Sequence, residues 1–362
     1  MNHTRRIVLL IIIHFLLSSC VRLDPDVIQA GSNDYNIAMQ SSRDEQMLLN
    51  LVRLKYHDTP YFLEASSVSS QFRLSTQVSA SADLEARPVR DTIGFGGNIS
   101  FNEQPTITYT PLQGNDFVQR LLIPVPLDTI MLLINSGWSI ERVLRMTVER
   151  INGISNAPSA SGPTPKEAPE YETFLEIASI LEELSKQDKI NMLYKQYDDK
   201  AEAVLSLDDA DDSTTQADEL RRLLGINGDS TQFKIVEGKV EKSPDNVIVM
   251  TTRSLLGILF YLSNSVEVPE SDRESGVVTK TYYTDGKEFD WSRLTQDLFR
   301  IRSKPSTSNT SMIKTNYRGK QFYIDDRDLS SKSTFTLLTH LFSLQAGNTE
   351  SLAPVLTIPV GQ

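Results

Sequence analysis

The sequence predicts an α+β protein with mixed, largely antiparallel sheets and flanking helices, placed after an N-terminal signal peptide. Runs of alternating polar and apolar residues indicate strands, and apolar residues at helical spacing indicate helices between them. The two kinds of run do not alternate regularly enough for a doubly wound parallel sheet. With 362 residues, of which 39% are hydrophobic, the chain is long enough for two ordinary domains.

The first 20 residues have the pattern of a secretory leader. Arg5 and Arg6 form a positive start, residues 7–17 form an apolar core, and the segment ends in Leu17-Ser18-Ser19-Cys20. This leader resembles a bacterial lipoprotein signal, which is cut just before the cysteine. A retained transmembrane anchor is the alternative, but the apolar core is shorter than the roughly 20 residues of a spanning helix and contains His14.

Cys20 is the only cysteine of the chain, so it can form no internal disulfide. The resemblance implies that its thiol and new amino terminus become acylated, with Leu17, Ser18 and Ser19 as the processing motif. Each buried CH2 of an acyl chain contributes about 0.8 kcal/mol to membrane binding, so several chains would hold the protein firmly. By the same resemblance, Val21 after the cysteine favours the cell outer membrane, with the body in the periplasm.

Charge excludes one class of partner. The net charge is −11, and removal of residues 1–19 would leave −13. Nucleic-acid binding depends on clustered Lys and Arg, so we expect none.

Composition divides the chain into five parts. The polar segment after Cys20 is broken by Pro25 and Gly31, which is typical of a tether. A stretch with four prolines and little that could be buried follows later. We expect a signal peptide (1–19), a lipidated cysteine and tether (20–34), an N-terminal α+β region (35–154), a Pro/Ser-rich linker or loop (155–169) and a C-terminal α+β region (170–362).

In the N-terminal region, Ser42 and Glu45 match a capping box and predict a helix over 43–56. Alternating runs then predict strands over 61–84 and 93–109. Short helices are expected at 115–123 and 127–136. Residues 144–149 favour a strand, although a helix from Ser139 onward competes with it.

In the C-terminal region, Phe174 to Leu184 describe one face of a helix. The remaining predicted elements are strands at 203–207, 233–236, 247–251 and 355–358, helices at 215–224, 252–263 and 329–345, and a hairpin at 312–324 that turns at Arg318-Gly319.

Several stretches together resemble a group of uncharacterised envelope lipoproteins of Gram-negative bacteria. They are 34–36, 45–54, 58–60, 105–112, 136–138, 149–153, 289–291 and 322–326. The resemblance implies an envelope location and no known activity.

Catalytic signals are weak. Beyond the leader the chain holds only His57 and His340, and it has no Gly-x-Ser-x-Gly elbow. With Cys20 acylated, zinc would need two distant histidines and carboxylates. We therefore predict no catalytic residues, no metal and no cofactor.

Two clusters are candidates for binding. Asp325, Asp326 and Asp328 lie between a predicted strand and a helix start, where they could bind a cation or act as acid and base, although helix capping or ion pairs around Arg327 explain them more simply. Aromatic residues gather around a predicted tip at 285–286, either as a recognition surface or as pins that hold the tip to the body. They are Tyr282, Tyr283, Phe289 and Trp291.

These observations favour an outer-membrane-anchored lipoprotein that acts as a non-enzymatic scaffold or accessory component of an envelope assembly. Its expected partners are the membrane, through Cys20, and an envelope protein. The alternatives are an anchored glycan or peptide hydrolase using Asp325, Asp326 or His340, and a tethered ligand-binding module.

Overall fold

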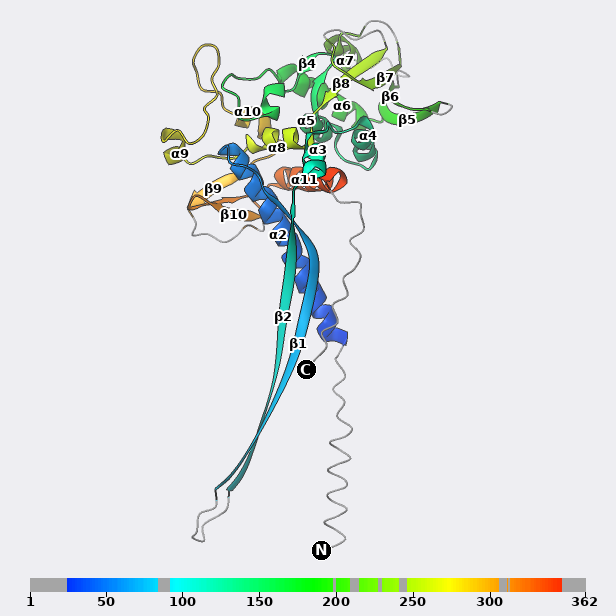
Figure 1. Cartoon of the computed structure of the whole chain (residues 1–362). Helices are drawn as coiled ribbons and strands as arrows, with labels where there is room; N and C mark the ends of the chain where they lie inside the picture. The colour runs from blue at the N-terminus through cyan, green and yellow to red at the C-terminus, as the bar shows by residue number, and fades with distance from the viewer. Residues whose placement is uncertain are drawn as a thin grey trace. The chain divides into compact units, whose positions relative to one another are not determined.

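The computed structural model describes residues 25–83, 92–197, 200–208, 215–226, 230–240, 246–305, 311 and 313–346 (Figure 1). The predicted leader, Leu17 to Cys20 included, and the predicted strand at 355–358 lie outside these residues. The described part confirms an α+β fold with mixed sheets. From Glu45 onward the described chain belongs to one compact unit. No helix in the described residues is long and apolar enough to cross a membrane.

The largest sheet has six strands in the order β4-β3-β8-β7-β6-β5. All neighbouring strands are antiparallel except β7 and β8, which are parallel. The strands are β3 (Val148–Ile151), β4 (Ile154–Ser155), β5 (Ile190–Tyr197), β6 (Lys200–Leu207), β7 (Gln232–Glu237) and β8 (Val247–Thr252). Strands β6, β7 and β8 confirm the prediction, whereas β4 and β5 were not predicted.

Helix α2 (Pro25–Lys55) is longer than predicted. Its backbone passes through Gly31 and Ser42, so the predicted helix start at Ser42 is wrong. Proline is tolerated at the first helical position, and one interior glycine costs only about 1 kcal/mol. The predicted apolar stripe is buried from Met47 to Leu54.

Strands β1 (Phe62–Asp83) and β2 (Thr92–Leu112) confirm the two predicted strands and form an antiparallel hairpin of 21 register pairs. At about 3.3 Å per residue, β1 is roughly 70 Å long, whereas most strands have 3–10 residues. Figure 1 shows the two strands running side by side along their length. They form a two-stranded sheet, and no other described strand pairs with either.

Three short helices follow the hairpin: α3 (Asn115–Leu122), α4 (Leu127–Asn135) and α5 (Ile140–Thr147). The first two confirm the prediction. The strand predicted at 144–149 is wrong over most of its length, because Ser139 caps α5 by accepting a hydrogen bond from Arg142 N at 3.2 Å. Only β3, which starts at Val148, is extended.

The proline-rich segment 155–169 is a packed loop. It contains the 3-10 turn η1 (Pro158–Ser161), and Asn156, Ala157 and Ala160 are fully buried. The expectation that this segment holds little that can be buried is therefore wrong.

Of the remaining helices in the described residues, four confirm predictions, and two, α9 (Glu270–Glu274) and α10 (Ser292–Thr295), were not predicted. The four are α6 (Glu172–Lys186), α7 (Thr215–Leu224), α8 (Leu255–Ser263) and α11 (Leu329–Ala346). A three-stranded antiparallel sheet has the order β10-β11-β9, with β9 (Arg302–Pro305), β10 (Lys314–Tyr317) and β11 (Lys320–Tyr323). The hairpin β10–β11 turns at Arg318 and Gly319, both with positive φ, as two-residue hairpin turns of type I′ require.

Candidate functional site

The root of the hairpin β1–β2 is fixed to the body by polar and aromatic contacts. Asn50 of α2 donates to Tyr61 O and accepts from Tyr61 N, both at 2.9 Å. The Phe62 ring, 5% exposed, lies 4.8 Å from the ring of Phe342 and 6.0 Å from that of Phe117, measured between centroids. The first residue of the hairpin is therefore part of the core.

The turn between α2 and β1 is tied to the segment 272–279, and also to β10, where the Tyr317 hydroxyl donates to the Asp58 carboxylate. The Tyr56 hydroxyl donates to Asp272 Oδ2 at 2.7 Å, and His57 Nε2 lies 2.8 Å from Thr279 Oγ1. Burial and the bond to Asp272 raise the pKa of Tyr56. Within the described ranges, the His57 ring thus contacts a hydroxyl and has no carboxylate partner of the kind that a catalytic triad requires.

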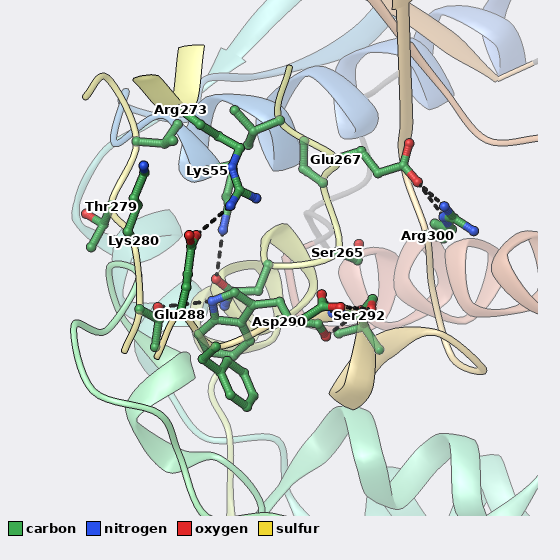
Figure 2. Close-up of a pocket in the computed structure, with 18 of the residues that line it drawn as sticks. Lys55, Ser265, Glu267, Arg273, Thr279, Lys280, Glu288, Asp290, Ser292 and Arg300 are labelled. Atoms are coloured by element: carbon green, nitrogen blue, oxygen red, sulfur yellow. Dashed lines mark hydrogen bonds and ion pairs between the residues drawn. The ribbon is translucent and has the colours of Figure 1, made fainter. Parts of the chain in front are cut away.

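A cavity of about 690 Å³ lies beside this turn (Figure 2). This volume is within the range of small-molecule sites. Its lining comes from the end of α2, the segment 264–281 and the segment 288–303. The lining includes valine and aromatic side chains as well as charged ones.

Lys55, the last residue of α2, is buried in the wall of this cavity with 5% of its surface exposed. Its Nζ lies 3.4 Å from Asn264 Oδ1 and 5.9 Å from the centroid of the Trp291 ring. Burial, reinforced by the positive charge of Arg273, lowers the pKa of Lys55 from 10.5 to about 8. Among the described residues, no carboxylate forms an ion pair with Lys55.

The carboxylates of the cavity already have partners. Glu288 accepts from Arg273 Nη2 at 2.6 Å, and Glu267 pairs with Arg300. Asp290 accepts from the backbone N of Ser292 at 2.9 Å and from its hydroxyl at 2.8 Å. Figure 2 shows these pairs as dashed contacts around the cavity.

The four aromatic candidates do not form one exposed surface. Phe289 and Trp291 are buried, 3% and 9% exposed, with ring centroids 5.0 Å apart, and both line the cavity. Trp291 Nε1 donates to Thr281 Oγ1 at 3.1 Å. Tyr283 packs against Phe289 and its hydroxyl accepts from Arg293, while Tyr282 is exposed. The interpretation of Phe289 and Trp291 as pins is therefore confirmed.

Each of the three acidic candidates has its own structural contact. Asp325 pairs with Arg302 at 3.3 Å, and Asp326 with Lys332 at 3.5 Å. Asp328 caps α11 by accepting from Ser331 N at 2.9 Å. These contacts confirm helix capping for Asp328, whereas the ion pairs involve Arg302 and Lys332 and are not centred on Arg327.

The remaining histidine, His340 of α11, lies edge-on to the Trp138 ring, with centroids 5.8 Å apart. Within the described part of the chain, no group of three or more His, Cys, Asp or Glu residues is arranged to hold a metal ion.

Lys55 was missed at the sequence level, although one signal was present. It stands four residues after Leu51 and seven after Leu48, both fully buried, so it lies on the apolar face of its helix. A lysine on that face is unusual, because charged side chains are rarely buried without a partner.

Comparison with known proteins gave no match to any family model, to any curated protein or to any solved structure.

Proposed function

We propose that this chain is a lipoprotein anchored to the cell outer membrane through acyl chains on Cys20. We propose further that its periplasmic body is a non-enzymatic scaffold or accessory component of an envelope assembly. The observation that carries the second part is the hairpin β1–β2, a long two-stranded sheet fixed at its root. We infer that its outer edges pair with the hairpins of further copies of this chain.

The general properties of two-stranded hairpins support pairing between copies. A two-stranded hairpin is marginally stable in water, and three or more strands are needed for independent stability. Each outer edge also presents a row of backbone N–H and C=O groups, which are a template for another strand. Strands of about 20 residues offer an unusually long template, which a second copy matches in length.

The register supports the same proposal. Successive residues of a strand belong to opposite faces of the sheet. The pairs that join apolar residues on one face are Val68 with Ile107, Leu74 with Phe101, Ala80 with Phe95, and Ala82 with Ile93. On the other face Gln71 pairs with Gln104, and Ser75 with Ser100. Glu103, across from Phe72, is a charged exception. A hairpin with two such faces extends into a wider amphipathic sheet when copies add edge to edge.

An exposed apolar face adjoins the root. On α3, Phe117 packs against Phe62, while Val118, Leu122 and Ile123 are about half exposed. Contiguous apolar surface is typical of protein contacts. We propose this face as a contact between neighbouring bodies.

Cross-linking between separately tagged chains tests the assembly. Ser75 and Ser100 face each other within one hairpin, so Ser75→Cys and Ser100→Cys are placed on different chains and coexpressed. Pairing of β1 from one copy with β2 from the next predicts cross-links between the two tags. Ser271→Cys, on exposed α9, is the control that should not cross-link. Chains that stay monomeric, or that cross-link only to another envelope protein, would contradict pairing between copies.

The anchor is tested separately. Cys20→Ala should release the protein from membranes and abolish acyl labelling, because the chain has no other cysteine. Unchanged membrane retention would contradict the lipoprotein proposal and leave the hairpin test unaffected.

A further inference from the structure

We propose that the cavity at Lys55 binds a small compound with a carboxylate and an apolar body. The carboxylate would pair with the Lys55 ammonium, and the apolar body would lie against Trp291 and Phe289. This inference is independent of the proposed strand pairing, because the cavity is formed by α2 and the segments 264–281 and 288–303.

The first argument is the cost of the buried ammonium. In the described structure, Lys55 Nζ contacts the side-chain amide oxygen of Asn264 and lies over the ring of Trp291. A buried charge without an opposite charge is strongly unfavourable. An anion in the cavity would compensate the charge of Lys55 and restore its ordinary preference for the protonated form.

The second argument is that the protein's own carboxylates are occupied. Glu288 and Glu267 are paired with the two guanidinium groups of the cavity, and Asp290 is held by Ser292. The four cationic side chains that line the cavity outnumber its three carboxylates, so one positive charge is in excess there; the cations are Lys55, Arg273, Lys280 and Arg300. A ligand anion beside Lys55 would compensate this excess.

The third argument selects a carboxylate over a phosphate. Phosphate sites commonly combine several donors, such as bidentate arginines or backbone N–H groups at a helix start. Here Arg273 and Arg300 already bind glutamates, and the buried donor is a single ammonium, which suits one negative charge. The wall beside it is apolar, with Val266, Val278, Phe289 and Trp291.

Calorimetry on the full-length chain tests the proposal, with phenylacetate as the probe and phenylacetamide and inorganic phosphate as comparisons. An anion next to Lys55 raises its pKa from about 8, so binding at pH 8 should take up roughly half a proton. Titrations in two buffers of different ionisation enthalpy measure this uptake. At pH 6 the uptake should vanish, because the ammonium is already protonated.

Phenylacetate should bind, and phenylacetamide should bind at least tenfold more weakly. Lys55→Met should also weaken phenylacetate at least tenfold, whereas Lys287→Met, at an 82% exposed lysine, should leave it unchanged. Absence of phenylacetate binding to the wild-type chain, or binding without proton uptake at pH 8, would overturn the proposal. Phosphate binding in place of phenylacetate would overturn the assignment to carboxylates. The wild-type measurements stand even if Lys55→Met fails to fold.

Discussion

Asn50 and Tyr61 are joined by two hydrogen bonds, in which the side-chain amide of Asn50 both donates to and accepts from the backbone of Tyr61 at 2.9 Å. The amide pairs with the residue before β1 as a neighbouring strand would. Asn50 has no exposed surface, so this contact fixes the start of the hairpin to the end of α2.

Replacement of Asn50 should therefore weaken the hairpin root. Asn50→Leu removes both bonds and leaves backbone groups of Tyr61 unpaired, which should lower the free energy of unfolding by about 1–3 kcal/mol. Urea denaturation followed by circular dichroism measures the change. Asn191→Ala, at an exposed position of β5, is the control, and equal stabilities of the two variants would contradict a fastening role.

Arg253 should be one of the most sensitive positions in the core. Its guanidinium is fully buried, donates to Arg145 O at 3.1 Å and Val148 O at 2.7 Å, and lies 4.1 Å from the centroid of the Tyr261 ring. Arg253→Met removes these hydrogen bonds from a charged group, although Asn156 Nδ2 still donates to the same two carbonyls, and we expect a loss of about 3 kcal/mol in unfolding free energy.

Arg253→Lys is the matched variant, because it keeps the charge but cannot reproduce the forked donors. It should be destabilising as well. Arg222→Met, at an exposed ion pair with Glu219, should change stability by less than about 1 kcal/mol. A small effect of both Arg253 variants in thermal or urea unfolding would contradict the structural role.

Loss of the N-cap of α5 should lower the stability by a smaller amount. Ser139 accepts from Arg142 N and donates to Glu182 Oε2 at 3.0 Å. Ser139→Ala should cost about 1 kcal/mol of unfolding free energy, the usual value for a lost N-cap. Ser139→Asp should retain the cap but place a second carboxylate next to Glu182, so at neutral pH it should recover less stability than a cap alone provides.

Glu182 should contribute a pH-dependent stability. Burial raises the pKa of its carboxyl, but hydrogen bonds from Ser139, Glu141 N and Lys186 outweigh burial and lower it below 4.5. The stabilisation is therefore present above pH 4.5 and lost as the pH falls through the folded-state pKa. The stability difference between wild type and Glu182→Gln should shrink on acidification, and a difference that stays constant would contradict the lowered pKa.

Lys55 should make the stability of the fold depend on pH in the alkaline range. Its folded-state pKa of about 8 lies below the ordinary 10.5, so the unfolded chain binds the proton more tightly. This group therefore destabilises the fold at neutral pH, by about 3 kcal/mol, and the penalty is relieved as pH rises from 8 toward 10.5. Lys55→Met should be more stable than wild type at pH 7, and the difference should narrow by pH 9.5. A constant difference would contradict the lowered pKa.

Local pattern determined much of this fold. Period-two alternation predicted both strands of the long hairpin, and the apolar stripes predicted α6 and α11, because these elements bury one face. The pair Arg318-Gly319 predicted the turn of the hairpin β10–β11, where both residues adopt positive φ. The leader and Cys20 remain predictions from sequence alone.

Tertiary structure decided the rest. The hydrogen bond to the Ser139 side chain determines that α5 is a helix and not a strand. Asn156 and Ala160 are buried, so the segment expected to be a linker packs against the core. The cavity unites Lys55 with Trp291, which is 236 positions away in the sequence, and no local pattern encodes that distance. Sequence periodicity shows which face of an element is buried, whereas its neighbours in the fold determine what that face contacts.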